Sequence, residues 1–233
     1  MAYGSAAKCV FIVHQCAAFA RFSTLAKTKP KSSSPTPPNS RIDATHISCY
    51  FHFQNTIRSC NTNQSKEDAM SLELPRFLTK ELALEMMGEI ARFVVATFPT
   101  KRTTFHIVML VPQMDYDSNE YPNNPITPCL LAEYSHDGHK AWERDYDNIA
   151  RCKALQLWHD RNDGGTDTKP HLLISGDTPY WGGVKRDGIV IACSGVEPYF
   201  DRMIAGMVAD ACIARSYRNY LTWRAENPDE DFT

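Results

Sequence analysis

The stretch from Gly182 to Asp201 constrains the fold of this chain most strongly. Two adjacent glycines open it, and the pair Asp187-Gly188 lies between two short extended segments. Asp and Gly tolerate the positive φ values of a tight turn, so this pair predicts a β-hairpin. The second arm, 189–192, reads Ile-Val-Ile-Ala without a polar residue, which predicts a strand that is buried on both faces.

The rest of the regular sequence places helices and further strands around this hairpin. Thr79 is a good helix N-cap, and apolar residues then recur at helical spacing as far as Thr97. The same reasoning predicts helices over 142–158 and about 199–223, and strands over 103–111 and 129–135. The order is helix, strand, strand, helix, strands and helix. It predicts an α/β sandwich with an antiparallel central sheet.

Several finer expectations concern strand ends and helix faces. Pro112 is expected to end the first strand, and 172–174 is expected to form a short strand. The small apolar face of 149–157 predicts that Arg151 and Lys153 face elsewhere or flank it. The inward face of the last helix is expected to hold Ile204, Met207, Val208, Ala211 and Tyr217 or Leu221.

Composition narrows the class of protein. The chain has 233 residues and a net charge of −2, which gives no electrostatic case for nucleic acid or an anionic membrane. No apolar run approaches the roughly 20 residues of a membrane-spanning helix. The eight cysteines include no C-x-x-C pair. Four of them lie in apolar surroundings and are interpreted as buried free thiols, which predicts a reducing, cytoplasmic compartment: Cys129, Cys152, Cys193 and Cys212.

The N-terminal segment differs from the rest. Residues 1–69 are expected to form an extension, 70–224 the domain and 225–233 an acidic tail. The extension is poor in acidic residues and contains a Pro/Ser-rich linker at 29–40. Three interpretations stay open: a mitochondrial transit peptide, a weaker secretory signal, or a gene-model extension with synthesis starting at Met70.

The hairpin and its surroundings resemble the GlcG/HbpS-like family, whose members are often described as heme-degrading domains. The resemblance covers about residues 72–223 and rests on the order of several short motifs. Arg151 to Leu155 is similar to the family's K-x-x-T-A helix segment, and Trp142 and His159 flank it as in the fungal and bacterial branch. The positions that match the glycine-rich strands and the last helix are Gly182, Gly183, Gly188, Ser194, Gly195, Asp201, Ala205 and Gly206.

The resemblance implies a profilin-like fold and a homo-oligomer that binds a small ligand or heme, with heme breakdown in some members. Heme iron needs an axial donor, and His159 is the better candidate here, with His171 second. No family heme ligand matches either histidine securely. The candidate cofactor-binding residues are His159, Gly182, Gly183, Ser194 and Gly195.

Two other functions stay open, and the sequence does not decide whether the protein is an enzyme. It contains no G-x-S-x-G elbow, P-loop or G-x-G-x-x-G motif. One alternative is a non-enzymatic assembly or adaptor protein that acts through protein–protein contacts. Another is an isomerase or reductase of a small organic acid that uses Lys153, Arg186 and Asp201. His106 and the turn histidines His136 and His139 are interpreted as structural or solvated rather than as metal ligands.

Overall fold

The computed structural model describes residues 58–59, 72–115, 125–138, 142–162, 164 and 169–230. The chain divides into two compact units, 1–40 and 41–233, and every described residue belongs to the second unit. The alternatives for the N-terminal segment therefore fall almost wholly outside the described residues. Within the expected extension, Arg58 and Ser59 form a short strand that pairs with the sheet.

The centre of the fold is an antiparallel sheet, as the sequence predicts. Its order is β1-β4-β3-β6-β5, in which the four strands from β4 to β5 are antiparallel and β1 runs parallel to β4. A further short strand, β2, pairs with β3. The strands are β1 (Arg58–Ser59), β2 (Leu72–Glu73), β3 (Phe105–Asp115), β4 (Ile126–His136), β5 (Gly183–Arg186) and β6 (Ile189–Ser194).

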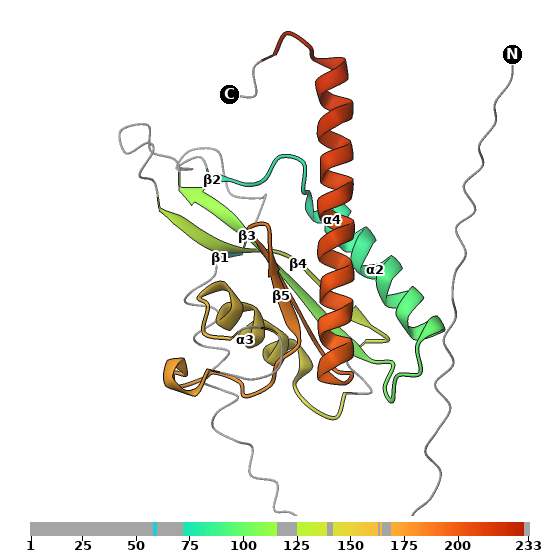
Figure 1. The fold of residues 1–233 in the computed structure, drawn as a ribbon, viewed down its shortest axis with the longest axis vertical. Coiled ribbons are helices and arrows are strands. Elements are labelled where there is room, and N and C mark those ends of the chain that lie inside the picture. The colour runs from blue at the N-terminus through green and yellow to red at the C-terminus, as the bar shows by residue number, and fades with distance from the viewer. Residues whose placement is uncertain are drawn as a thin grey trace, which may run out of the picture. The chain divides into compact units, whose positions relative to one another are not determined.

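Helices flank this sheet, which confirms the predicted α/β class (Figure 1). The helices are α2 (Lys80–Thr97), α3 (Tyr146–Trp158), the short 3₁₀ helix η2 (Pro170–Leu172) and α4 (Pro198–Glu226). Two separate buried apolar clusters show that α2 and α4 pack on one face of the sheet and α3 on the other. Strand β3 alternates between them, because Ile107 and Met109 belong to the first cluster and Val108 and Leu110 to the second. The profilin-like topology stays a prediction.

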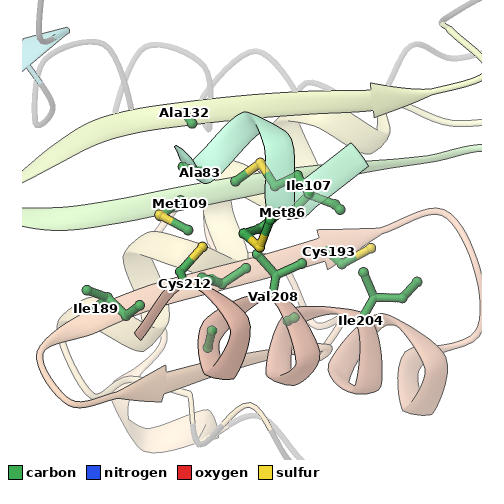
Figure 2. Close-up of a cluster of buried hydrophobic side chains, with 14 of the residues drawn as sticks. Ala83, Met86, Ile107, Met109, Ala132, Ile189, Cys193, Ile204, Val208 and Cys212 are labelled. Carbon is green, nitrogen blue, oxygen red and sulfur yellow. The ribbon is translucent and has the colours of Figure 1, made fainter. Parts of the chain in front are cut away.

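The predicted hairpin is confirmed. Asp187 and Gly188 both have positive φ, 48° and 84°, and the strands pair from Arg186 and Ile189 outward. Every residue of β6 is buried, which agrees with its continuous apolar sequence. Figure 2 shows Cys193 on this strand beside Val208 and Ile204 of α4, in the larger apolar cluster. The Thr79 cap is also present, since its Oγ1 accepts from the amide of Leu82 at 3.2 Å.

Pro112 does not end β3, and this prediction was wrong. The strand continues to Asp115 and pairs with β4 at Pro112 and Gln113 and with β2 at Met114. Strand β6 pairs only with residues 106–110, so one edge of β3 has no partner at the proline. A missing amide is tolerated at such an edge.

Three further expectations need correction. Helix α3 begins at Tyr146 instead of residue 142, and 172–174 forms no strand because η2 occupies its start. Tyr217 and Leu221 of α4 do not face inward, since they are 63% and 46% exposed. The last buried residue of this helix is Cys212, so the helix continues well beyond the part that packs on the sheet (Figure 1).

The four cysteines of the domain do not share one state. Cys193 and Cys212 are free and buried, as expected, and burial raises the pKa of Cys212 to about 12. Burial likewise raises the pKa of Cys193 well above its usual range. Cys129 and Cys152 are disulfide-bonded, so the free-thiol prediction was wrong for these two. The prediction of a reducing compartment rested on four free thiols, and only those of Cys193 and Cys212 still support it.

Candidate ligand pocket

A pocket of about 230 Å³ lies where α3 and α4 begin. Tyr146 and Pro198 are the first residues of the two helices, and both line it. The N-terminal end of a helix carries a partial positive charge and unsatisfied amide groups, so both helices favour negative charge here. The complete lining is Arg102, Arg144, Tyr146, Ile149, Lys153, Tyr180, Ser194, Gly195, Val196, Pro198 and Asp201.

The floor of the pocket is a buried ion pair between α3 and α4. Lys153 Nζ lies 3.0 Å from Asp201 Oδ2 and donates to the Cys193 carbonyl oxygen at 2.8 Å. Asp201 Oδ1 accepts from the amide of Val196 at 3.1 Å. Each of the two charged residues is only 2% exposed. Such a pair is stable only because its charges are matched and hydrogen-bonded inside the protein.

Burial and charge act on Asp201 in opposite directions. Removal from water raises the pKa of Asp201, and this effect outweighs the attraction of the Lys153 ammonium, which lowers it. The ammonium group has three donors, of which two are used by Asp201 and Cys193 among the described residues. The floor of the pocket is therefore a buried ion pair in which the ammonium keeps one donor beyond those that bind Asp201 and Cys193.

Two glycines of the stretch from Gly182 to Asp201 allow this ion pair to form at the floor of the pocket. Gly182 has φ of 127°, and a Cβ there would lie 2.5 Å from the Asp201 Cβ and 3.2 Å from Lys153 Nζ. Gly195 has φ of 140°, and a Cβ there would lie 2.5 Å from the Thr104 carbonyl oxygen. L-residues with side chains rarely adopt these conformations, so glycine is required at both positions for close approach.

Two arginines, Arg102 and Arg144, line the pocket. Arg102 forms an ion pair with Glu143 at 2.8 Å, and the two side chains are 44% and 65% exposed. Arg144 donates to the Tyr180 hydroxyl and lies 5.6 Å from the centre of its ring. The loop that carries Tyr180 is fixed by a buried amide, because Gln156 both donates to and accepts from the Thr178 backbone.

The structure brings together only some of the residues predicted for the site. Ser194 and Gly195 line the pocket, and Gly182 touches its floor. Gly183 does not line it, since a Cβ there would meet the Leu157 side chain and the β6 backbone. His159 is exposed at the far end of α3 and is not a lining residue.

The other candidates separate in the same way. His171 is exposed on η2, and Arg186 pairs with Asp210 on the surface, so neither lies at the pocket. Lys153 was expected to face elsewhere than the small apolar face of α3 or to flank it, and the structure buries it at the pocket. The signal that identifies it is its spacing of four residues from both Ile149 and Leu157, which puts all three on one helix face. No sequence signal points to Arg102, Arg144 or Tyr180.

The pocket residues fit heme poorly. Its lining contains no histidine, cysteine or methionine, and only Tyr146 and Tyr180 belong to a residue type that ligates heme iron. Tyr146 is 4% exposed, and the Tyr180 hydroxyl is already bonded to Arg144. Ligation by His159 would therefore need a different surface, and heme binding there stays a prediction.

A second cluster of charges lies nearby on β3, β4 and α3. Arg151 holds Glu133 through two bonds of 2.6 and 2.9 Å. His106 is 4% exposed, its Nδ1 lies 2.8 Å from Ser135 Oγ, and its Nε2 lies 3.5 Å from Glu133. None of these side chains lines the pocket, so the interpretation of His106 as structural agrees with its surroundings.

Comparison with protein-family models, with curated proteins and with solved structures finds no match to this chain. The GlcG/HbpS-like resemblance therefore stays a prediction. Across the described ranges, no cluster of three or more His, Cys, Asp and Glu side chains has the arrangement to hold a metal ion. In that same part of the chain, no helix combines the length and apolar character needed to cross a membrane.

Proposed function

We propose that this protein binds a small organic anion, a carboxylate or a phosphate, in the pocket between the ends of α3 and α4. One observation carries the proposal: two arginines and the N-terminal ends of two helices converge on a cavity whose floor holds a buried lysine. Arginine binds both carboxylate and phosphate through paired donors. The lining contains three cationic side chains and one carboxylate, Asp201, and this excess of positive charge favours an anion.

The Glu143 carboxylate that pairs with Arg102 can be displaced by a ligand. Glu143 and Arg102 are both well exposed, and ion pairs of this kind contribute little to stability in water. A ligand carboxylate can replace the Glu143 carboxylate on Arg102 without a rearrangement of the fold. Arg144 is held beside the pocket by the Tyr180 ring, which restricts its motion before a ligand arrives.

The chemistry of the pocket also bears on the alternative functions. Convergent polar groups beside Gly182 favour a bound ligand, whereas a flat apolar surface there would favour an adaptor or assembly role. The observed lining supports the ligand. A homo-oligomer of the GlcG/HbpS-like type, with heme as its ligand, remains the function that the resemblance implies, and no residue of the pocket adds support to the heme.

Titration calorimetry of the full chain with inorganic phosphate, acetate, succinate and pyruvate tests the proposal. We expect at least one of these anions to bind, with a Kd that rises about tenfold in Arg102→Gln and in Arg144→Gln. Arg215→Gln is the matched control, because Arg215 forms an exposed pair with Glu85 and does not line the pocket. If none of the anions binds, the proposal is wrong. A hemin-induced Soret shift that His159→Ala abolishes would favour heme instead.

A further inference from the structure

We propose that Lys153 is a nucleophile that forms a Schiff base with a 2-oxo acid bound in the pocket, and that Asp201 moves the protons of this step. The inference rests on the proposed function, because the arginines must first bind the carboxylate of the acid. It adds a reaction class to a site that otherwise only binds. The reaction class follows from what the floor of the pocket presents to a ligand.

The position of the Lys153 amine is the first argument. Its side chain is almost completely buried, yet it borders the cavity together with Asp201 and Ser194. A lysine that only linked α3 to α4 would not need to face an open cavity. The bare backbone of Gly182 closes over the pair, and its absent Cβ leaves Lys153 Nζ in place. Burial favours the neutral amine, the form of lysine that enzymes use as a nucleophile, and the Asp201 carboxylate beside it is positioned to take the proton that the ammonium must lose.

The arrangement of the cavity selects the ligand. Arg102 and Arg144 supply cationic groups for a carboxylate, and Lys153 supplies a nitrogen for an electrophilic carbon. A volume of about 230 Å³ suits a molecule of few heavy atoms, in which these two functions are close together. A 2-oxo acid has a carbonyl carbon directly bonded to its carboxylate. Ser194 also lines this cavity, and a serine hydroxyl is a suitable donor to the carbonyl oxygen.

The proton steps balance within the pair. The Lys153 ammonium first transfers a proton to the Asp201 carboxylate over their 3.0 Å contact, and burial, which raises the pKa of Asp201, favours this transfer. The amine lone pair then forms the C–N bond, and the former carbonyl oxygen takes the proton from Asp201. Asp201 next removes a second proton from nitrogen and delivers it to the hydroxyl, which leaves as water. The product is an iminium ion paired with the Asp201 carboxylate.

Reductive trapping of the unmodified full chain is the test. The protein is incubated with pyruvate and cyanoborohydride, and the adduct, one pyruvate less one oxygen atom, is located by peptide mass mapping. We expect Lys153 to be labelled about tenfold or more faster than Lys185, whose exposed amine pairs with Asp160. Asp201→Asn should slow the labelling of Lys153 and leave that of Lys185 unchanged. Lactate, which has no carbonyl carbon, should bind without forming an adduct.

The outcomes separate the two proposals. If pyruvate and lactate both bind in calorimetry and Lys153 is not labelled, or is labelled no faster than Lys185, the Schiff base is wrong and the anion pocket stands. If neither pyruvate nor lactate binds and Lys153 is not selectively labelled, both the anion pocket and the Schiff base are wrong for small carboxylic acids. Selective labelling of Lys153 in the unmodified protein supports the inference without any variant that could fail to fold.

Discussion

Arg151 and Lys153 lie two residues apart on α3, and both reach a carboxylate on another element, yet their surroundings differ. Arg151 donates to Glu133 through two short hydrogen bonds and also to Asp147 and Asn148, and none of these residues lines the described pocket. Lys153 meets one carboxylate and one carbonyl at the floor of a pocket. The first pair fits fork to fork, whereas the second leaves a donor for another group.

The two pairs show how a charge pair at a candidate site differs from one that only links two elements. Both pairs link α3 to a neighbouring element at similar distances, so distance alone does not distinguish them, although the Lys153–Asp201 pair is the more deeply buried. The pairs also differ in two further respects: Lys153 keeps a hydrogen-bond donor for another group, and only the Lys153–Asp201 pair lines the pocket. Variants of the two pairs and of Gly182 test this distinction.

Lys153→Met should cause the largest loss of stability. It leaves the Asp201 carboxylate buried without its cation, which costs about 3–5 kcal/mol in the free energy of unfolding. Urea denaturation monitored by circular dichroism measures this loss. Arg151→Met should cost less, because Glu133 is partly exposed and can recover water. Equal losses in the two variants would remove the stability difference between the pairs.

A fall in pH should weaken the contribution of Glu133 to stability and strengthen that of Asp201, because the folded-state pKa is lowered for Glu133 and raised for Asp201. Burial alone would raise the pKa of Glu133, but His106 and Arg151 outweigh it and lower the pKa from 4.5 to about 2. Arg151 is the stronger partner, since the His106 contact is 3.5 Å long. A lowered folded pKa means that this stabilisation is present above about pH 4.5 and is lost as the pH falls towards 2.

The expected loss is on the order of 3 kcal/mol between pH 5 and pH 2, and Glu133→Gln should remove this part of the pH dependence. Asp201 has a raised pKa, so its own contribution is present below its ordinary value of 3.8 and is lost as the pH rises. Urea titrations at a series of pH values measure both slopes. An unchanged acid slope in Glu133→Gln would contradict the assignment.

Gly182→Ala should destabilise the protein by about 2 kcal/mol, through a positive φ and a Cβ placed 2.5 Å from that of Asp201. Gly188→Ala is the matched control. Its φ is also positive, at 84°, but no atom lies within 4 Å of the added Cβ, so about 1 kcal/mol of backbone strain remains. Thermal unfolding compares the two. We expect only Gly182→Ala to weaken anion binding as well.

The fold was largely predictable because its strongest signals are local. The Asp187-Gly188 turn, the unbroken apolar run of β6 and the Thr79 cap each depend on a few adjacent residues. The errors fell where distant contacts decide. Pro112 stays inside β3 because β6 ends before reaching it, and that depends on register between strands far apart in sequence.

The candidate site was only half predictable. Gly182 and Ser194 were predicted from a local pattern, whereas Lys153, which lies four residues from both Ile149 and Leu157, was expected to face elsewhere than the apolar face of α3 or to flank it. Arg102 lies just before β3 and Arg144 just before α3, and they reach one cavity only because the folded sheet and helix bring those two connections together. No periodicity within either connection encodes that meeting.

The length of α4 has a consequence for local opening. At 29 residues it is about 43 Å long, whereas the six residues of β6 extend only about 20 Å. Beyond Cys212 no residue of the helix is buried, and ring contacts of Trp223 and Tyr220 with Phe77 support its distal part. Amide hydrogens should therefore exchange slowly up to Cys212 and progressively faster beyond it. The distal turns can open and close on their own while Asp201, in the first turn, keeps the pocket floor closed.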